Sequence, residues 1–210
     1  MSDATQLSIE NQNQHNPEVG LSQGNLFRKF GMWLFLSSEL LIFGGLIFVF
    51  ALSRDSIVLK GEHWPHFEIV PSLLLVSFNT FVLLASSWFV VEGIEAIRVN
   101  NNEGLRKWMI ATILGGVAFL LGQAVEYTTL IRVEGHSMAE PFGGAFFTLT
   151  GLHGLHVFAG VIWCILLLPR IKAKAFSAKN YTTIEMFGLY WHFVDVVWIL
   201  IFTVIYLLNG

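Results

Sequence analysis

The stretch AFFTLTGLHGLHVFAGVIWCILLL, residues Ala145–Leu168, decides the fold class of this chain. It contains no Asp, Glu, Lys or Arg, and it is long enough for a helix to cross the hydrocarbon core of a bilayer, which takes about 20 residues. Four further stretches have a comparable length and character. These are Phe30–Leu52, Val70–Val91, Trp108–Leu130 and Met186–Leu208. The sequence therefore predicts an all-α polytopic membrane protein, a bundle of five transmembrane helices.

The composition supports this prediction. Hydrophobic residues make up 54% of the 210 residues and charged residues 13%, and the mean hydropathy is +0.63. A soluble domain averages about 45–50% apolar and about 25% charged residues, so a soluble enzyme and a disordered regulator are excluded. The net charge of −3 leaves no basic excess for phosphates, so we expect no nucleic-acid partner. The one cysteine, Cys164, cannot build a disulfide framework, a zinc ribbon or an iron–sulfur site within this chain alone.

The polar residues outside the spans predict the domain organisation and the orientation. Residues 1–27 are aperiodic and lack the charged and apolar regions of a cleavable signal, so we expect a mobile cytoplasmic tail, with residues 28–210 as the transmembrane domain. Of the 12 Lys and Arg residues, all but Arg54, Lys60 and Arg132 fall directly before the first span, at Arg28 and Lys29, or in the second and fourth loops. Because basic residues concentrate on the cytoplasmic side, the sequence predicts a cytoplasmic N-terminus and a periplasmic C-terminus.

Six acidic or histidine residues lie inside the apolar spans, where a charged side chain costs about 2.5–3.5 kcal/mol on insertion scales. They are Glu39, Glu126, His153, His156, His192 and Asp195. Each of them needs a partner or a change of protonation state. We therefore treat these six residues as the candidate functional residues of the chain.

The rise of 1.5 Å per helical residue gives the depth of each group. Glu39 lies about 14 Å and His156 about 18 Å from the cytoplasmic edge, so a hydrogen bond between their two helices is geometrically possible. His192 and Asp195 are three residues apart and therefore share a face of the fifth helix. Two interpretations stay open: these residues fix helix register as buried polar groups, or at least one of them, foremost Glu39, handles protons.

The same spacing bears on other kinds of site. His153 and His156 are a possible pair of haem ligands. The alternative function, from another class of protein, is therefore an electron carrier with a bis-His haem b. Such a haem takes two His from different helices at matching depth, and His192 lies about 8 Å shallower than His156, so the spacing argues against it. A proton-coupled carrier is disfavoured because no inverted repeat is present. No hydrolase, metalloprotease or phosphate-binding motif occurs, so we expect no catalytic residue, no metal ligand and no cofactor ligand in this chain.

Five segments in order carry a resemblance to a known family. Gly151–Trp163 (GLHGLHVFAGVIW) and Tyr190–Tyr206 (YWHFVDVVWILIFTVIY) closely resemble subunit III of haem–copper oxidases. Gly31–Leu41 (GMWLFLSSELL), Asn79–Ser86 (NTFVLLAS) and Gly122–Tyr127 (GQAVEY) are similar to further helices of that family. The resemblance covers nearly the whole chain from Lys29 to Asn209.

This resemblance implies an accessory, cofactor-free subunit of a proton-pumping terminal oxidase, foremost a cytochrome c oxidase. A quinol oxidase subunit and a homologue associated with nitric oxide reductase are the alternatives. The implied partners are the haem-bearing subunit I, subunit II and membrane phospholipid. The haem and copper are expected in the partner subunits. The implied location is the inner membrane of a bacterium, and the implied role is to support assembly, stability and proton uptake. By position, Glu39 matches the buried carboxyl of the family and His156 its hydrogen-bond partner.

One departure from the family bears on lipid binding. The mitochondrial type has seven spans, and this chain lacks the first two, which form one wall of a lipid-filled cleft in that type. We therefore expect the lipid sites of that cleft to be incomplete in this chain.

Overall fold

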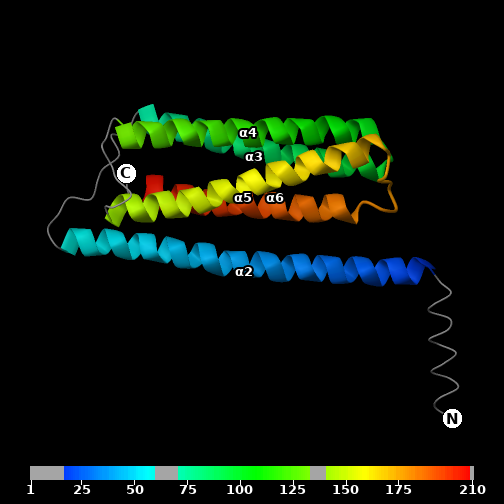
Figure 1. Cartoon of the computed structure of the whole chain (residues 1–210), viewed down its shortest axis with the longest axis horizontal. Helices are drawn as coiled ribbons and strands as arrows, with labels where there is room; N and C mark the ends of the chain where they lie inside the picture. Colours follow the sequence, from blue (N-terminus) through cyan, green and yellow to red (C-terminus); the bar gives the residue numbers. More distant parts are fainter. Residues whose placement is uncertain (1–16, 60–70, 133–140, 209–210) are drawn as a thin grey trace, which may run out of the picture. The chain divides into compact units, whose positions relative to one another are not determined.

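The structure is a computed structural model that describes residues 17–59, 71–132 and 141–208. All of the described residues belong to helices or to short connections between them, and no strand occurs among them (Figure 1). The elements are α2 (Pro17–Leu59), α3 (Pro71–Arg98), α4 (Asn102–Arg132), α5 (Pro141–Lys172), α6 (Thr182–Phe202) and the π-helix η1 (Thr203–Leu207). The chain forms two compact units, residues 1–38 and residues 39–210.

The five predicted spans are present as five helices that are long and apolar enough to cross a membrane. Their apolar parts are Gln23–Arg54, Leu73–Arg98, Asn102–Arg132, Phe142–Lys172 and Thr182–Leu207. The first helix begins at Pro17 rather than at Phe30, because the polar residues before the span continue its helix. The prediction of a mobile tail concerns residues 1–27, of which residues 1–16 lie outside the described residues.

In the first unit, the described residues 17–38 are helical throughout. Two consecutive serines use their hydroxyls within this helix, which keeps them satisfied in an apolar environment. Ser37 donates to the carbonyl of Trp33 at 2.8 Å, and Ser38 donates to that of Phe35 at 2.7 Å.

In the second unit, α3, α4, α5 and α6 close a ring in which each helix packs against two others (Figure 1). Small residues allow α3 and α4 to approach closely. A Cβ atom built on Gly115 would lie 2.7 Å from Cβ of Ser86, and one built on Gly122 would lie 2.7 Å from Asn79. Packing between membrane helices relies on such small residues, since lipid tails are as apolar as the helices themselves.

Tryptophan side chains fill the interior of this ring. Trp191 of α6 lies against two glycines, one on α4 and one on α5, and a Cβ atom on Gly116 or Gly160 would come within 2.8 Å of its ring. The indole Nε1 of Trp191 donates to Oγ of Ser86 at 3.0 Å, and that of Trp198 donates to Oγ1 of Thr80 at 2.9 Å. Both indoles therefore bury their apolar surface while each N–H finds a hydroxyl on α3.

The connections α3–α4 and α5–α6 lie at one end of the ring. The backbone N–H of Ala178 donates to Oδ1 of Asn100 at 2.8 Å, which joins the two connections. Asn100 itself has a φ of 57°, a left-handed conformation that Asn tolerates better than most residues. This end of the ring carries the basic residues of both connections, among them Arg98, Lys174 and Lys179.

Candidate functional site

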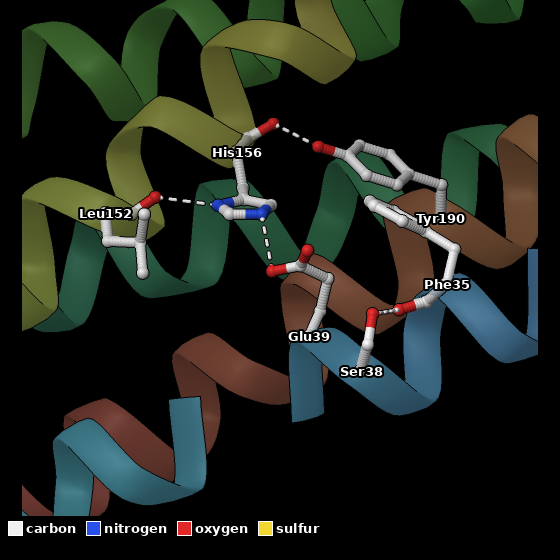
Figure 2. Close-up of polar contacts among 6 residues, drawn as sticks. All are labelled: Phe35, Ser38, Glu39, Leu152, His156 and Tyr190. Atoms are coloured by element: carbon white, nitrogen blue, oxygen red, sulfur yellow. Dashed lines mark hydrogen bonds and ion pairs between the residues drawn. The ribbon is translucent and has the colours of Figure 1, made fainter. Parts of the chain in front are cut away.

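The structure brings Glu39 of α2 and His156 of α5 together, as their predicted depths allowed. The Nε2 atom of His156 lies 3.2 Å from Oε2 of Glu39, and both side chains are only 14% exposed (Figure 2). The other nitrogen of the imidazole, Nδ1 of His156, lies 2.8 Å from the carbonyl oxygen of Leu152. The hydroxyl of Tyr190 donates to the backbone carbonyl of His156 at 2.8 Å, and Phe43 meets the imidazole edge-on.

These contacts restrict where protons can sit. A backbone carbonyl only accepts hydrogen bonds, so Nδ1 of His156 carries a proton and donates it to Leu152. The Nε2 atom then faces Glu39 either as the acceptor of a carboxylic acid O–H or as the N–H donor of an imidazolium. The pair can therefore hold one proton between two atoms, on the carboxyl or on the ring.

His153, one turn from His156 on the same helix, has a different environment. It is fully buried, and neither ring nitrogen has a hydrogen-bond partner. Its ring stacks on Trp198 at a centroid distance of 4.8 Å and meets Phe119 edge-on at 5.6 Å. The two histidines of the His-x-x-His pattern thus do not act as a pair on one partner.

Glu126 of α4 is bound by a residue of the π-helix. The hydroxyl of Tyr206 donates to Oε1 of Glu126, and both side chains are buried. Next to Glu126 in sequence, Tyr127 takes part in a second polar cluster with Gln123 and Thr150. Gln123 Nε2 donates to the Thr150 carbonyl at 2.8 Å, and the Tyr127 hydroxyl lies 2.8 Å from Oγ1 of Thr150. Glu126 and His153 are not hydrogen-bonded to each other, since neither ring nitrogen of His153 has a partner.

His192 and Asp195 share the face of α6 that meets α3, as their spacing predicted. Oγ of Ser87 lies 2.6 Å from Nδ1 of His192, and the same hydroxyl interacts with the carboxyl group of Asp195. Asp195 is buried, and its Oδ1 atom has no hydrogen-bond partner. Ser87 therefore links two of the six candidate residues.

Among residues 17–59, 71–132 and 141–208, no group of three or more His, Cys, Asp or Glu side chains could hold a metal ion. The polar groups instead form separate pairs and small clusters that join neighbouring helices. Such arrangements can fix helix register and can hold individual protons.

Comparison with known proteins decides the family. Residues 7–209 match the family model of cytochrome c oxidase subunit III. The chain belongs to this family. The subunit III of Thermostichus vulcanus is 35% identical over 210 residues, which cover 99% of this chain and 96% of that relative. A probable cytochrome c oxidase subunit 3 of Mycobacterium tuberculosis H37Rv is 39% identical over 179 residues, which cover 85% of this chain and 87% of the relative. That of Synechocystis is 39% identical over 184 residues, covering 86% and 76% respectively.

Family membership confirms the resemblance predicted from the sequence and makes the chain an accessory subunit of an oxygen-reducing respiratory oxidase. It also favours this function over the haem b electron carrier, which belongs to a different class of protein. The other subunits of an oxidase are accordingly the partners of a subunit III chain.

Two elements of the polar network were not predicted from the sequence of this subunit III chain. Ser87 was not recognised as the link between His192 and Asp195, and Tyr206 was not recognised as the donor to Glu126. The available signal was the group of hydroxyl and amide residues within one apolar span. These are Asn79, Thr80, Ser86 and Ser87 of α3, and all four face neighbouring helices in the structure.

Proposed function

We propose that this subunit supports the assembly, stability and proton uptake of the haem-bearing subunit I of a bacterial cytochrome c oxidase. Subunit II is the second proposed partner, and the proposed location is the inner membrane. The electron donor is taken as cytochrome c rather than quinol because the relatives from Thermostichus vulcanus and Synechocystis are named cytochrome c oxidase subunit 3. The haem and copper of the complex would lie in the partner subunits.

The buried pair of Glu39 and His156 is the observation that carries the proton-uptake part of this proposal. A carboxyl group costs free energy inside the apolar region unless it is neutral or paired, and here it is held 3.2 Å from a titratable ring. A pair that accepts or releases one proton without leaving its hydrogen bonds can buffer protons next to a proton-pumping partner. A role in helix register alone would need only the hydrogen bond and not the exchange of a proton.

For the orientation, we propose that the end of the ring with the α3–α4 and α5–α6 connections faces the cytoplasm. Arg98, Lys174 and Lys179 gather there, which suits the preference of basic residues for the cytoplasmic side. Glu39 and His156 would then lie on the cytoplasmic half of the membrane or near its middle, in keeping with their predicted depths.

Bound phospholipid is proposed for a groove between α2 and η1. The groove has a volume of about 370 Å³ and is lined by apolar side chains except for one cation at its end, Arg54. Gly44 and Arg54 of the lining are ten residues apart on α2, so the groove extends about 15 Å along the helix. This arrangement suits an acyl chain along the groove with its phosphate at the guanidinium.

Two experiments test this proposal. In the first, the oxidase is purified through an affinity tag on this chain. In the second, the oxidase is prepared from cells that lack the chain. We expect the tagged chain to carry a larger haem-containing subunit with it. An oxidase without the chain should keep its haem, start at the parent rate and then lose proton uptake or active life during turnover. A stable, isolated tagged chain with no affinity for a haem subunit would contradict the assembly role. Unchanged proton uptake and active life after deletion would contradict the functional role alone.

A further inference from the structure

The junction of α3 and α6 holds a histidine whose two nitrogens have different environments. Nδ1 of His192 is bound to Ser87 at 2.6 Å inside the junction. Nε2 has no partner among the described residues, yet it is not sealed off as both nitrogens of His153 are. Nε2 of His192 is therefore a polar atom at the outer surface of the ring of helices.

This atom lies at membrane depth. His192 is ten residues from Thr182, the first residue of α6, which places it about 15 Å along the helix. Its neighbours on the same side of α6 are apolar and exposed: Val196 is 55% and Ile199 is 40% exposed. On the adjoining edge of α3, Leu84 and Val91 are 40% and 47% exposed. We call these four residues together with His192 the α3–α6 face.

The bond to Ser87 holds the imidazole of His192 in one orientation. Oγ of Ser87 lies 2.6 Å from Nδ1, and a hydroxyl can either donate to this nitrogen or accept from it. If Ser87 accepts from Nδ1, Nε2 is an acceptor. If Ser87 donates to Nδ1, Nε2 carries the proton and is a donor. In both tautomers Nε2 needs a partner.

We propose that the α3–α6 face docks on a membrane-spanning helix of the haem-bearing subunit, which presents a hydroxyl or carboxamide side chain to Nε2 of His192. This inference rests on the proposed function and adds the surface that makes the contact. Lipid tails offer neither a donor nor an acceptor, so a face bathed in lipid would leave Nε2 unsatisfied at a cost in free energy. A hydroxyl or carboxamide can both donate and accept, and it therefore satisfies Nε2 in either tautomer of His192.

The ring of helices provides a matched control for the position of this face. α4 packs against α3 and α5, as α6 does, so α4 and α6 stand at opposite corners of the ring. Leu121 of α4 is 63% exposed and resembles Val196 in chemistry and exposure. A photo-crosslinking residue can be placed at either position without touching a hydrogen bond.

The first experiment places p-benzoylphenylalanine at Val196 or at Leu121 in the intact oxidase and identifies the crosslinked chain. We expect the Val196 variant to crosslink to the haem-bearing subunit and the Leu121 variant not to do so. Crosslinking from Leu121 but not from Val196 would overturn the proposed face while leaving the subunit in its complex. An intact complex with no crosslink from Val196 would overturn it as well. A chain that purifies alone, without a haem subunit, would instead contradict the proposed function.

The second experiment separates Nε2 from the inner bond. His192→Phe removes Nε2 and also the bond between Nδ1 and Ser87. His192→Gln keeps a polar group at the end of the side chain, and Ser87→Ala removes only the bond to Nδ1. We expect His192→Phe to raise the rate at which the subunit is lost from the complex in detergent by about threefold, the factor given by an average interhelical hydrogen bond in a membrane protein. His192→Gln should recover part of this loss, and Ser87→Ala should have the smaller effect. Parent-like retention of His192→Phe, or an equal loss in Ser87→Ala, would overturn the role of Nε2.

Discussion

The carboxyl group of Glu39 is hydrogen-bonded to His156 through the one ring nitrogen that the backbone does not occupy. Leu152 binds Nδ1 at 2.8 Å, so only Nε2 is available to Glu39, at 3.2 Å. The position of the His156 imidazole is therefore set by its own helix, α5, and α2 places the carboxyl group of Glu39 next to it. A proton exchanged between the two side chains moves along the line between Nε2 and Oε2.

Glu39→Gln tests whether this proton matters. The amide keeps the size and a hydrogen bond to His156 but cannot give up a proton. We expect the variant oxidase to keep its haem content and to lose proton pumping or active life during sustained turnover. Steady-state oxygen consumption together with proton release from vesicles measures both. The matched control is Glu103→Gln, an exposed position in the first turn of α4, which should behave as the parent does. Parent-like proton yield and lifetime in Glu39→Gln would leave Glu39 with a structural role only.

The two histidines of α5 should respond in opposite ways to replacement by phenylalanine. His153→Phe removes two buried nitrogens that have no partner, each a desolvation cost of about 1–3 kcal/mol, and keeps the aromatic contact with Trp198 and Phe119. We expect its subunit to be at least as stable as the parent. His156→Phe leaves the carboxyl of Glu39 without its imidazole partner and should destabilise the subunit by about 1–3 kcal/mol.

Thermal or denaturant release of the subunit from the purified oxidase provides the measurement for this pair of variants. Because both changes lie on one helix and are the same substitution, differences in expression or helix propensity cancel. A loss in His153→Phe as large as that in His156→Phe would mean that the nitrogens of His153 make bonds of their own.

Gly160→Ala tests the close approach of Trp191 to α5. The added methyl group would lie 2.7 Å from the indole ring and 3.1 Å from Tyr190, and neither ring can retreat within the filled interior. Overpacking of this kind costs about 1–3 kcal/mol, which should appear as earlier thermal release of the subunit. Gly151→Ala on the same helix is the control, since its nearest neighbour is the Tyr127 hydroxyl at 3.6 Å. The control should be neutral or gain up to about 1 kcal/mol from helix propensity. Equal stability of the two variants would contradict the described contact of Gly160.

The sequence predicts the position of a residue along its helix better than the direction in which its side chain leaves the helix. Position along a helix follows from its constant rise, and so the five spans and the approach of Glu39 to His156 could be predicted. Rotation about a helix axis depends on which helices are neighbours. The surroundings of His153 and of His156 therefore could not be told apart from a spacing that treats them alike.

The bond between Tyr206 and Glu126 shows a second limit. Tyr206 lies in the π-helix Thr203–Leu207, where the wider turn changes the direction in which side chains leave the helix. No residue pattern in the last apolar span marks this change of pitch. The link through Ser87 was missed for a different reason, because a serine within a span more often bonds to the carbonyl one turn earlier in its own helix, as Ser37 does.

Arg54→Gln tests the proposed phospholipid in the groove between α2 and η1. The groove offers a hydrogen-bond fork for a phosphate only at Arg54, so neutralising it should release one phospholipid per subunit from the detergent-purified oxidase. Native mass spectrometry, or phosphate analysis normalised to haem, gives the count. Ala51→Trp fills the apolar part of the groove and should release the same lipid by a different route. Arg132→Gln, the matched change at the end of another span, should keep it. Unchanged lipid content in both groove variants would contradict a lipid at this site. Loss of the whole subunit rather than of lipid would indicate that a protein helix lies in the groove instead.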